Sequence, residues 1–265
     1  MQQDLAQHDE PNEASLVTQK RQGAVLTLAL NRPEALNAFN NELFDAFARA
    51  IIQATEDDSV KVIIVTGTGR AFSAGLDLST VGQTESAEHG FSGVFDRLIA
   101  CPKPILLAIN GIGVGVGCTI CGLVDMVFMA ESAKLRCPFT ALGLTAEAAS
   151  TITFPALMGH QAATWALLSS EWLDAETCQR LGLAYAVVAD EQLLQEVQQH
   201  AQILAAQPLA SLKATKELIM APRLESMRVV AEKEGKVLSA MMGGPANREA
   251  IAAFQGKRAP DFSAF

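Results

Sequence analysis

The sequence predicts an α/β core followed by a C-terminal helical region. Short apolar runs of strand length alternate with segments of helical periodicity, and helical periodicity alone fills the end of the chain. With 265 residues and 49% hydrophobic content, the chain is long enough to bury a sizeable core. We expect a core over residues 14–200 and, in the same functional unit, helices over 201–265; residues 1–13 are polar and are expected to form a flexible arm.

The individual elements follow from apolar periodicity and from turn residues. Strands are expected at 16–19, 24–30, 60–65, 105–109, 125–129, 134–137 and 184–188, with a further short one leading into a small-residue loop at 70–77. Helices are expected from Asn40 as a cap to about Thr55, at 91–100, at 146–158 with Thr145 as a cap, at 160–169 and at 175–181. From 191 to 254 the pattern is helical, with breaks expected at Pro208, Pro222 and Gly243–Pro245.

The stretch from Pro104 to Met129 has an unusual arrangement of glycines. A buried-strand pattern is followed by an Asn-Gly turn and then by glycines at alternate positions, before a segment of helical potential at 118–123; these are Gly113, Gly115 and Gly117. Glycines at a strand-to-helix junction leave backbone N–H groups open to a ligand, and the helix start adds partial positive charge. This stretch therefore predicts one half of an anion-stabilising pocket.

Three other interpretations of this stretch compete with a pocket. Pro104–Val124 carries no charged residue, as a membrane span would. However, its five glycines disfavour a spanning helix, since each costs about 1 kcal/mol relative to Ala. The dinucleotide fingerprint G-x-G-x-x-G fails, because Cys118 occupies the sixth position from Gly113. Close packing of a helix on a strand would explain the glycines equally well from this stretch alone.

Composition narrows the class of protein. The 20 basic and 29 acidic residues give a net charge of −9, which disfavours general nucleic-acid binding. An odd number of cysteines in apolar surroundings predicts reduced thiols in a cytoplasmic protein; they are Cys101, Cys118, Cys121, Cys137 and Cys178. Cys118-x-x-Cys121 lacks a second ligand pair, so we expect no metal site, and buried small residues are favoured over a redox pair.

Three segments resemble the enoyl-CoA hydratase/isomerase (crotonase) superfamily: NRPEALNA at 31–38, RAFSAGLD at 70–77 and NGIGVGVGC at 110–118. The resemblance covers nearly the whole chain. It implies a crotonase-like spiral of ββα units with a C-terminal helical trimerisation region, assembled as a homotrimer or a hexamer made of two trimers. It also implies an acyl-CoA substrate of fatty acid β-oxidation, with coenzyme A as part of the substrate, no separate cofactor, and no nucleic-acid or membrane partner.

The same resemblance assigns an oxyanion hole and a coenzyme A site. Its two donors would be the backbone N–H groups of Leu76 and Val116, each hydrogen bond being worth about 2.7–4 kcal/mol in the transition state. The residues implied for substrate and coenzyme A binding are Ala35, Leu36, Ala38, Ser73, Ala74, Gly75, Asp77, Gly115, Thr119, Phe139, Leu142, Phe254 and Lys257. Arg258 is expected to assist Lys257, whereas a solvated tail is the alternative for both. After Asp77 the chain lacks the lysine that many relatives carry, which weakens one expected phosphate contact.

The expected base is Glu147. The two glutamates of hydratases in this family would align with Thr119 and Phe139, neither of which is acidic. The arrangement is similar to that of the Δ3,Δ2-enoyl-CoA isomerases of the peroxisomal type, whose single catalytic glutamate matches Glu147. The resemblance thus implies a double-bond shift from 3-enoyl-CoA to trans-2-enoyl-CoA. The alternative for Glu147 is an exposed residue in a first helical turn.

Other functions stay open from the sequence. These are hydration with displaced carboxylates, dehalogenation, decarboxylation, thioester hydrolysis, and acyl-CoA binding without turnover. The polar segment 78–91, which includes His89, is expected to be mobile, and its role is left open. Asp125 is expected to bind backbone groups at the start of its strand, while Trp165, Trp172 and Tyr185 are expected in the core or at an interface.

Overall fold

Two β-sheets form the centre of the protein, whose structure is a computed structural model that describes residues 15–80 and 87–265. The larger sheet has the strand order β1-β2-β3-β5-β7-β10, and the smaller has the order β4-β6-β8-β9. The strands are β1 Val17–Gln22, β2 Val25–Leu30, β3 Val62–Gly67, β4 Ala71–Ser73, β5 Ile105–Ile109, β6 Ile112–Val114, β7 Met126–Ala130, β8 Lys134–Arg136, β9 Leu173–Asp174 and β10 Ala186–Val188.

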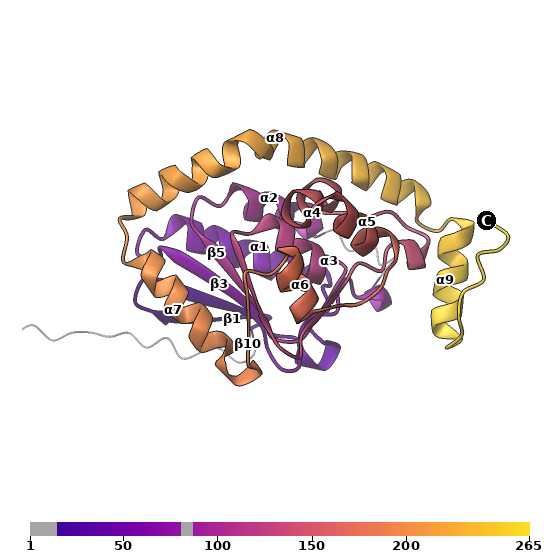
Figure 1. Ribbon diagram of the computed structural model, residues 1–265, viewed down its shortest axis with the longest axis horizontal. Coiled ribbons are helices and arrows are strands. Elements are labelled where there is room, and N and C mark those ends of the chain that lie inside the picture. The colour runs from indigo at the N-terminus through magenta and orange to yellow at the C-terminus, as the bar shows by residue number, and fades with distance from the viewer. Residues whose placement is uncertain (1–14, 81–86) are drawn as a thin grey trace, which may run out of the picture.

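Helices cover these sheets and extend beyond them (Figure 1). They are α1 Asn41–Glu56, α2 Gly90–Ala100, α3 Val116–Thr119, α4 Ser150–Met158, α5 His160–Leu168, α6 Ala175–Leu181, α7 Leu193–Ala205, α8 Leu209–Met241 and α9 Pro245–Gln255. Short 3-10 helices occur at Pro33–Ala35, Leu78–Thr80, Ile120–Leu123, Thr140–Leu142 and Asp190–Gln192. The predicted arm at 1–13 and part of the predicted mobile segment, 81–86, lie outside the described residues.

The strand pairs produce the repeated ββα pattern of the predicted spiral. In each of the pairs β3–β4, β5–β6 and β7–β8, the first strand joins the larger sheet and the second joins the smaller sheet, before a helix follows. Strands β3, β5 and β7 pair in parallel, as do β4, β6 and β8. Repetition of this pattern brings the loops after β4 and β6 to neighbouring positions, which places the candidate site.

Burial on both faces explains the continuous apolar runs of the central strands. Every residue of β3 and β5 is buried, as expected for parallel strands covered on both sides. Helix α7 packs against β2, β3, β5 and β7. Helix α1 begins as predicted, because the Asn40 side chain accepts a hydrogen bond from the Leu43 N–H at 3.0 Å.

The C-terminal helices differ from the prediction at Pro222. Figure 1 shows α8 as one long, arched helix that runs over α2 and α4, so the expected break at Pro222 is wrong. Proline removes one backbone hydrogen bond, and both Pro222 and Leu218 are exposed. Water can therefore solvate the freed carbonyl of Leu218, and the helix continues.

One face of α8 is fixed to the core by buried residues spaced by four, seven and seven positions, namely Lys216, Met220, Met227 and Glu234. The Lys216 ammonium lies 2.7 Å from the Asp125 carboxylate, which also accepts a 2.7 Å hydrogen bond from the Ile105 N–H. The predicted role of Asp125 at its strand start is thus confirmed. Trp165, Trp172 and Tyr185 are exposed by 61%, 42% and 59%, so they are not core residues of this chain; their place at an interface stays a prediction.

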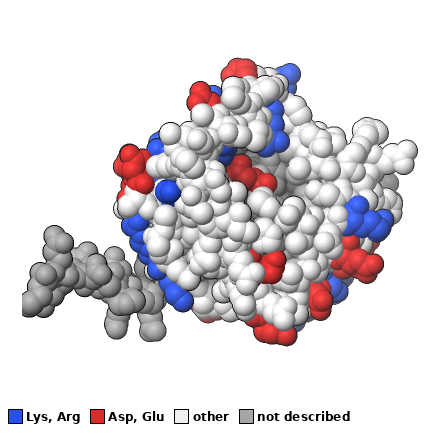
Figure 2. Space-filling view, turned by 60° about the vertical axis from the view of Figure 1, so that its left-hand side comes forward, with Lys and Arg blue, Asp and Glu red and all other residues white. Residues whose placement is uncertain are grey.

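The surface of the molecule carries both acidic and basic residues, in keeping with the composition of the sequence. Figure 2 shows acidic and basic side chains interspersed among larger uncharged areas on one face of the molecule. In the part of the chain that the structure describes, no helix is both long and apolar enough to span a bilayer. No group of three or more His, Cys, Asp or Glu among the described residues is placed to hold a metal ion. All five cysteines are buried and unpaired by disulfides.

Candidate active site

Two glycine loops from the smaller sheet meet at the centre of the site. Gly75 follows β4 and Gly115 follows β6, with φ values of +88° and +55°. A Cβ atom built on Gly75 would lie 2.6 Å from the Val114 carbonyl oxygen, and one on Gly115 would lie 3.9 Å from the Gly75 Cα. Only glycine combines this backbone conformation with so close an approach at position 75.

Pairing of this loop with Phe39 sets the direction of the Leu76 N–H. Phe39 and Leu76 form an isolated parallel bridge. In it, the Phe39 N–H donates to the Gly75 carbonyl at 2.7 Å, and the Asp77 N–H donates to the Phe39 carbonyl at 2.8 Å. Because adjacent peptide groups of an extended chain face opposite sides, the intervening Leu76 N–H points away from Phe39.

The second predicted donor begins a helix beside this loop. Val116 is the first residue of α3, so its N–H has no acceptor within the helix. The hydrogen bonds among the described residues leave the N–H groups of both Leu76 and Val116 without a protein acceptor. Two unpaired donors therefore follow two glycines that nearly touch, which is the arrangement required of an oxyanion hole.

Close packing of α3 on β4 holds the two loops together. A Cβ atom on Gly117 would come within 2.6 Å of the Ser73 carbonyl oxygen. The Ser73 hydroxyl donates to the Asn37 carbonyl at 2.8 Å and accepts from the Gly75 N–H at 3.2 Å. Close packing thus explains Gly117, while the interpretation of the glycines before Leu76 and Val116 as part of a pocket stays a prediction.

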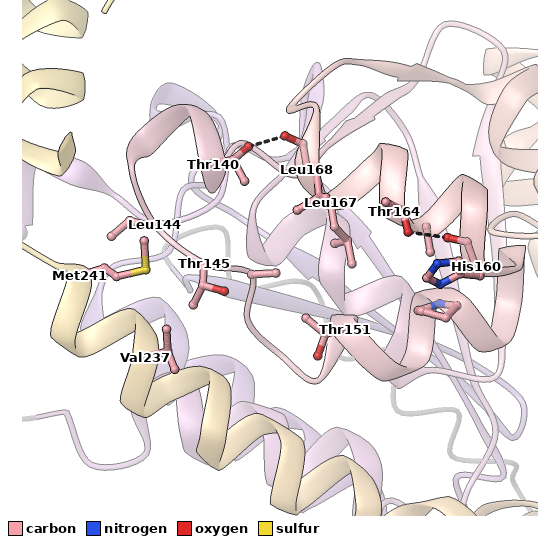
Figure 3. A pocket seen from close by; sticks show the side chains of 13 residues that line it. Thr140, Leu144, Thr145, Thr151, His160, Thr164, Leu167, Leu168, Val237 and Met241 are labelled. Atoms are coloured by element: carbon pink, nitrogen blue, oxygen red, sulfur yellow. Dashed lines mark hydrogen bonds between the residues drawn. The ribbon is translucent and has the colours of Figure 1, made fainter. Parts of the chain in front are cut away.

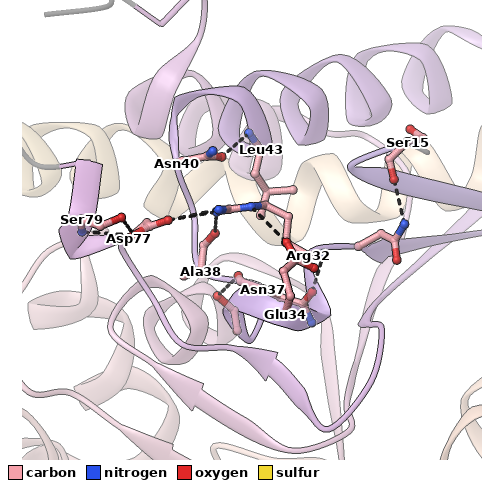
Figure 4. Close-up of polar contacts among 11 residues, drawn as sticks. Ser15, Arg32, Glu34, Asn37, Ala38, Asn40, Leu43, Asp77 and Ser79 are labelled. Atoms are coloured by element: carbon pink, nitrogen blue, oxygen red, sulfur yellow. Dashed lines mark hydrogen bonds and ion pairs between the residues drawn. The ribbon is translucent and has the colours of Figure 1, made fainter. Parts of the chain in front are cut away.

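A polar network supports the loop after β4. Its central residue, Asn37, was not predicted from the sequence (Figure 4). Asn37 is fully buried, with a left-handed φ of 55°. Its side-chain amide donates to the carbonyls of Thr68 and Ala71, each at 2.9 Å, and its oxygen accepts from the Arg32 N–H at 2.8 Å. Asn occupies left-handed backbone more readily than most residues, which was the available signal.

Arg32 connects this network to Asp77. Its guanidinium donates to the Ala38 carbonyl at 2.6 Å and lies 3.2 Å from the Asp77 carboxylate (Figure 4). The Ser79 hydroxyl and, more weakly, Arg32 hold the pKa of the Asp77 carboxyl below its ordinary value. The segment around Ala35, Leu36 and Ala38 is thereby fixed beside Ser73 and Ala74, whose N–H donates to the Leu36 carbonyl at 2.9 Å. The structure thus groups most of the residues predicted for coenzyme A binding.

Glu147 lies against the helix that carries the second donor. Its carboxylate accepts a 2.6 Å hydrogen bond from the hydroxyl of Thr119, at the C-terminal end of α3. Glu147 is half-buried and precedes α4, so the alternative of an exposed first-turn glutamate is wrong. Burial raises the pKa of Glu147 to about 7, against a lowering effect of the Thr119 hydrogen bond and with a further increase from the charge of Glu234.

The turn between Glu147 and α4 departs from the predicted helix. Helix α4 begins at Ser150 and not at 146, so the predicted Thr145 cap is also wrong. Ala148 and Ala149 have φ values of 59° and 55°, in the left-handed region that alanine rarely occupies. Local propensity predicts helix for these alanines, and contacts from elsewhere in the chain override it.

The remaining predicted residues occupy two places. Phe139 is buried and accepts a 2.8 Å hydrogen bond from the Leu144 N–H, while the Leu142 carbonyl accepts one of 2.7 Å from the Asn247 amide of α9. Phe254, at the other end of α9, is 70% exposed. Lys257 is exposed as well, and no hydrogen bond or ion pair among residues 15–80 and 87–265 joins its side chain to the glycine loops. Arg258 pairs with Glu249.

A cavity of about 380 Å³ lies next to the segment before Glu147 (Figure 3). Its lining is mainly apolar and comes from α4, α5, α8 and the loop of Thr145 and Ala146; Val237, Met241, Leu167 and Leu168 contribute side chains. Thr145 and Ala146 flank Glu147 in the chain, but Glu147 is not among the lining residues. The cavity therefore adjoins the segment that precedes the candidate base, without being lined by the base itself.

Comparisons with known proteins agree with this architecture. The family model described as enoyl-CoA hydratase/isomerase matches residues 20–264. A 1,2-epoxyphenylacetyl-CoA isomerase from Escherichia coli is 34% identical over 90% of this chain and 95% of the relative. Enoyl-CoA delta isomerase 2 from Homo sapiens is 30% identical over 81% of this chain and 56% of the relative.

A solved structure extends the similarity to three dimensions. The enoyl-CoA hydratase/isomerase from Pseudoalteromonas atlantica superposes with a TM-score of 0.90 at 32% identity, covering 94% of this chain and 100% of that one. A family model that matches residues 20–264 and a shared fold at 32% identity point to one origin. The chain belongs to the enoyl-CoA hydratase/isomerase family.

Proposed function

We propose that this protein is an enoyl-CoA isomerase that converts 3-enoyl-CoA to trans-2-enoyl-CoA, with Glu147 as its proton carrier. One observation carries the proposal: the Glu147 carboxylate is hydrogen-bonded to Thr119, on the same short helix whose first N–H group, that of Val116, has no protein acceptor. The candidate base is thereby held against the helix that carries an oxyanion donor, as proton abstraction next to a thioester requires.

The reaction needs a single acid–base group. The Glu147 carboxylate removes a proton from C2, and the electrons of the broken bond move onto the thioester oxygen to give a dienolate. The N–H groups of Leu76 and Val116 stabilise this oxygen. Glu147 then returns the proton to C4, the double bond moves from C3–C4 to C2–C3, and the thioester carbonyl re-forms. Atoms and charge balance without water or a separate cofactor.

The environment of Glu147 suits both halves of this transfer. A pKa of about 7 lets one carboxyl group accept a proton and then release it near neutral pH. A carboxylate with an ordinary pKa would be a weaker base towards the acidic C2 position, because its proton affinity would be lower. Half-burial of Glu147 is therefore a functional property and not only a consequence of packing.

Hydration is the alternative reaction. A hydratase must activate a water molecule, for which its family uses two glutamates, but the corresponding positions hold Thr119 and Phe139. The Thr119 hydroxyl is already engaged with Glu147, and Phe139 is buried and apolar. Binding of acyl-CoA without turnover is the other alternative. Neither explains why a carboxyl group with a raised pKa is hydrogen-bonded to the helix that begins at Val116.

Coenzyme A binding and assembly are part of the proposal. The backbone around Ala35, Leu36 and Ala38, together with Ser73, Ala74 and Asp77, would hold the adenine and pantetheine portions. Phe254 and Lys257 lie on an exposed end of the chain, where they would meet the nucleotide of a neighbouring subunit in a homotrimer or hexamer. Thr119, Phe139, Leu142 and Gly115 would surround the thioester and the adjoining acyl carbons.

A spectrophotometric assay of 3-hexenoyl-CoA beside crotonyl-CoA tests the reaction. We expect 3-hexenoyl-CoA to gain the absorbance of a conjugated enoyl thioester, because the double bond moves next to the carbonyl group. We expect crotonyl-CoA to retain its absorbance. Loss of the crotonyl-CoA absorbance with no conversion of 3-hexenoyl-CoA would identify a hydratase, and binding of both esters without spectral change would identify a binding protein.

A further inference from the structure

Glu234, on α8, is a buried carboxylate without a cation. Its residue is 6% exposed, and it forms no ion pair with any Lys, Arg or His that the structure describes. An isolated buried charge is costly unless hydrogen bonds compensate it. Glu234 is far from Glu147 in the sequence, and no motif singles it out.

Among the described residues, Glu234 accepts hydrogen bonds only from the start of α4. Its carboxylate accepts from the Ala149 N–H at 2.6 Å, from the Thr151 N–H at 3.0 Å and from the Thr151 hydroxyl at 2.6 Å. Helix α4 has no capping side chain of its own, because alanine occupies its N-cap position. Glu234 thus supplies from another helix the acceptor that a local Ser or Asp usually provides.

These hydrogen bonds hold the unfavourable turn that directs Glu147. Ala148 and Ala149 are both left-handed, and each such residue costs on the order of 1–3 kcal/mol unless its surroundings enforce it. One of the three hydrogen bonds of Glu234 is to the N–H of Ala149 itself. On the other side of the turn, the Ser150 hydroxyl and N–H donate to the Glu147 carbonyl at 2.6 and 3.1 Å.

We propose that Glu234 is the positioning residue for Glu147: its carboxylate fixes the Ala148–Ala149 turn and so holds the Glu147 side chain against Thr119 of α3. The contacts that carry this inference are those between α8 and the start of α4. Its consequence for turnover rests on the proposed function, whereas its consequence for the ionisation of Glu147 does not.

A second effect of Glu234 is electrostatic. Around Glu147, α3 contributes the Thr119 hydroxyl and α8 contributes the Glu234 carboxylate. Like charge disfavours ionisation, so Glu234 adds to the effect of burial and raises the pKa of Glu147. Helix α8 therefore both orients the candidate base and increases its basicity.

Glu234→Gln, compared with Glu232→Gln, tests this role. Glu232 is exposed on the same helix and pairs with Lys236, so it provides the same change of charge without the contact to α4. Gln can offer only one acceptor oxygen to the Ala149 and Thr151 N–H groups. We expect Glu234→Gln to lower kcat for 3-hexenoyl-CoA by about ten- to a hundred-fold, as a small displacement of a catalytic group does.

The pH profile separates positioning from simple loss of stability. Removal of the Glu234 charge lowers the pKa of Glu147, so the midpoint of kcat/KM against pH should move to lower pH in Glu234→Gln. Glu232→Gln should retain both the wild-type rate and the wild-type midpoint. Equal midpoints in the two variants would overturn the inference, whatever their rates.

A measurement without substrate distinguishes the failure of this inference from that of the proposed function. Carbon-13 NMR of labelled glutamate, with Glu147→Gln to identify the signal, follows the titration of the Glu147 carboxyl directly. If wild-type protein does not isomerise 3-hexenoyl-CoA, the proposed function fails, yet a lowered Glu147 midpoint in Glu234→Gln still supports the inference. An unchanged midpoint contradicts it, whatever the activity.

Thr151→Val provides a second variant if Glu234→Gln does not fold. It keeps the branched shape of the side chain and removes only the hydroxyl that donates to Glu234 at 2.6 Å. We expect a smaller fall in kcat than in Glu234→Gln, because two backbone donors still hold Glu234. A wild-type kcat and a wild-type titration of Glu147 in folded Thr151→Val would then count against the inference.

Discussion

Glu147→Gln is expected to lower kcat for the isomerisation of 3-enoyl-CoA by about a hundred- to ten-thousand-fold, the range that a single acid–base group contributes. Gln keeps the shape of the side chain but cannot remove or return a proton. The oxyanion donors and the coenzyme A site are unchanged, so the affinity for an acyl-CoA should stay near that of wild type. Stopped-flow or steady-state kinetics, together with calorimetric titration of a saturated acyl-CoA, measure the two quantities.

An exposed glutamate provides the control for this variant. Glu131 is exposed, and Glu131→Gln should isomerise at the wild-type rate. Full activity in Glu147→Gln would remove Glu147 from the mechanism. Loss of both activity and acyl-CoA affinity would show that Gln had disturbed the site as a whole, and would also contradict the assignment.

As the pH rises, the stability of the folded protein should fall while its activity increases. The pKa of Glu147 is raised from 4.5 to about 7, so the folded state binds this proton more tightly than the unfolded state does. The resulting stabilisation is fully present below pH 4.5 and is lost as the pH rises through about 7. Wild-type Tm should therefore fall more steeply than the Tm of Glu147→Gln across this window, as differential scanning calorimetry can measure.

Gly75→Ala is expected to lower kcat by about a hundred- to a thousand-fold, the loss that follows removal of one oxyanion donor. The new Cβ would lie 2.6 Å from the Val114 carbonyl oxygen, in a residue whose φ is +88°. The backbone must move, and it carries the adjacent Leu76 N–H away from its position. Kinetics with 3-hexenoyl-CoA would show the loss in kcat.

Gly23→Ala separates this effect from the general cost of alanine at a left-handed position. Gly23 has a φ of +62° in the β1–β2 turn, and nothing lies within 4 Å of an added Cβ atom. Its replacement should reduce Tm slightly and leave kcat unchanged. If Gly75→Ala retained wild-type kcat, the Leu76 N–H would not serve as an oxyanion donor.

The sequence predicted the elements whose pattern is local. The apolar run at 105–109 corresponds to β5, and Asn40 caps α1 as expected. Strand β6 was not predicted, because its glycine-rich sequence has low strand propensity and forms a strand only by pairing with β4 and β8. Pro222 was overestimated as a helix breaker, since proline propensity takes no account of a solvated carbonyl.

The candidate site likewise contains residues that could be predicted from the sequence and residues that could not. The glycines before Leu76 and Val116 could be identified from the sequence, because a left-handed backbone position usually requires glycine. Ala148 and Ala149 are left-handed too, but alanine does not indicate such a backbone, so a helix was predicted there. The contact that we propose holds them comes from α8, where the Glu234 carboxylate accepts a hydrogen bond from the Ala149 N–H. Helix α8 shows buried positions spaced by four and seven residues, but this spacing does not indicate what a buried glutamate contacts.

The central claim is that one carboxyl group of raised pKa moves the proton, and the pH dependence of kcat/KM for 3-hexenoyl-CoA tests it most directly. The rate should rise with pH through a single ionisation whose midpoint is about 7 in wild type, and this rise should disappear in Glu147→Gln. A rate that is independent of pH from roughly 5 to 9, or the same pH-dependent rate in Glu147→Gln, would contradict the account.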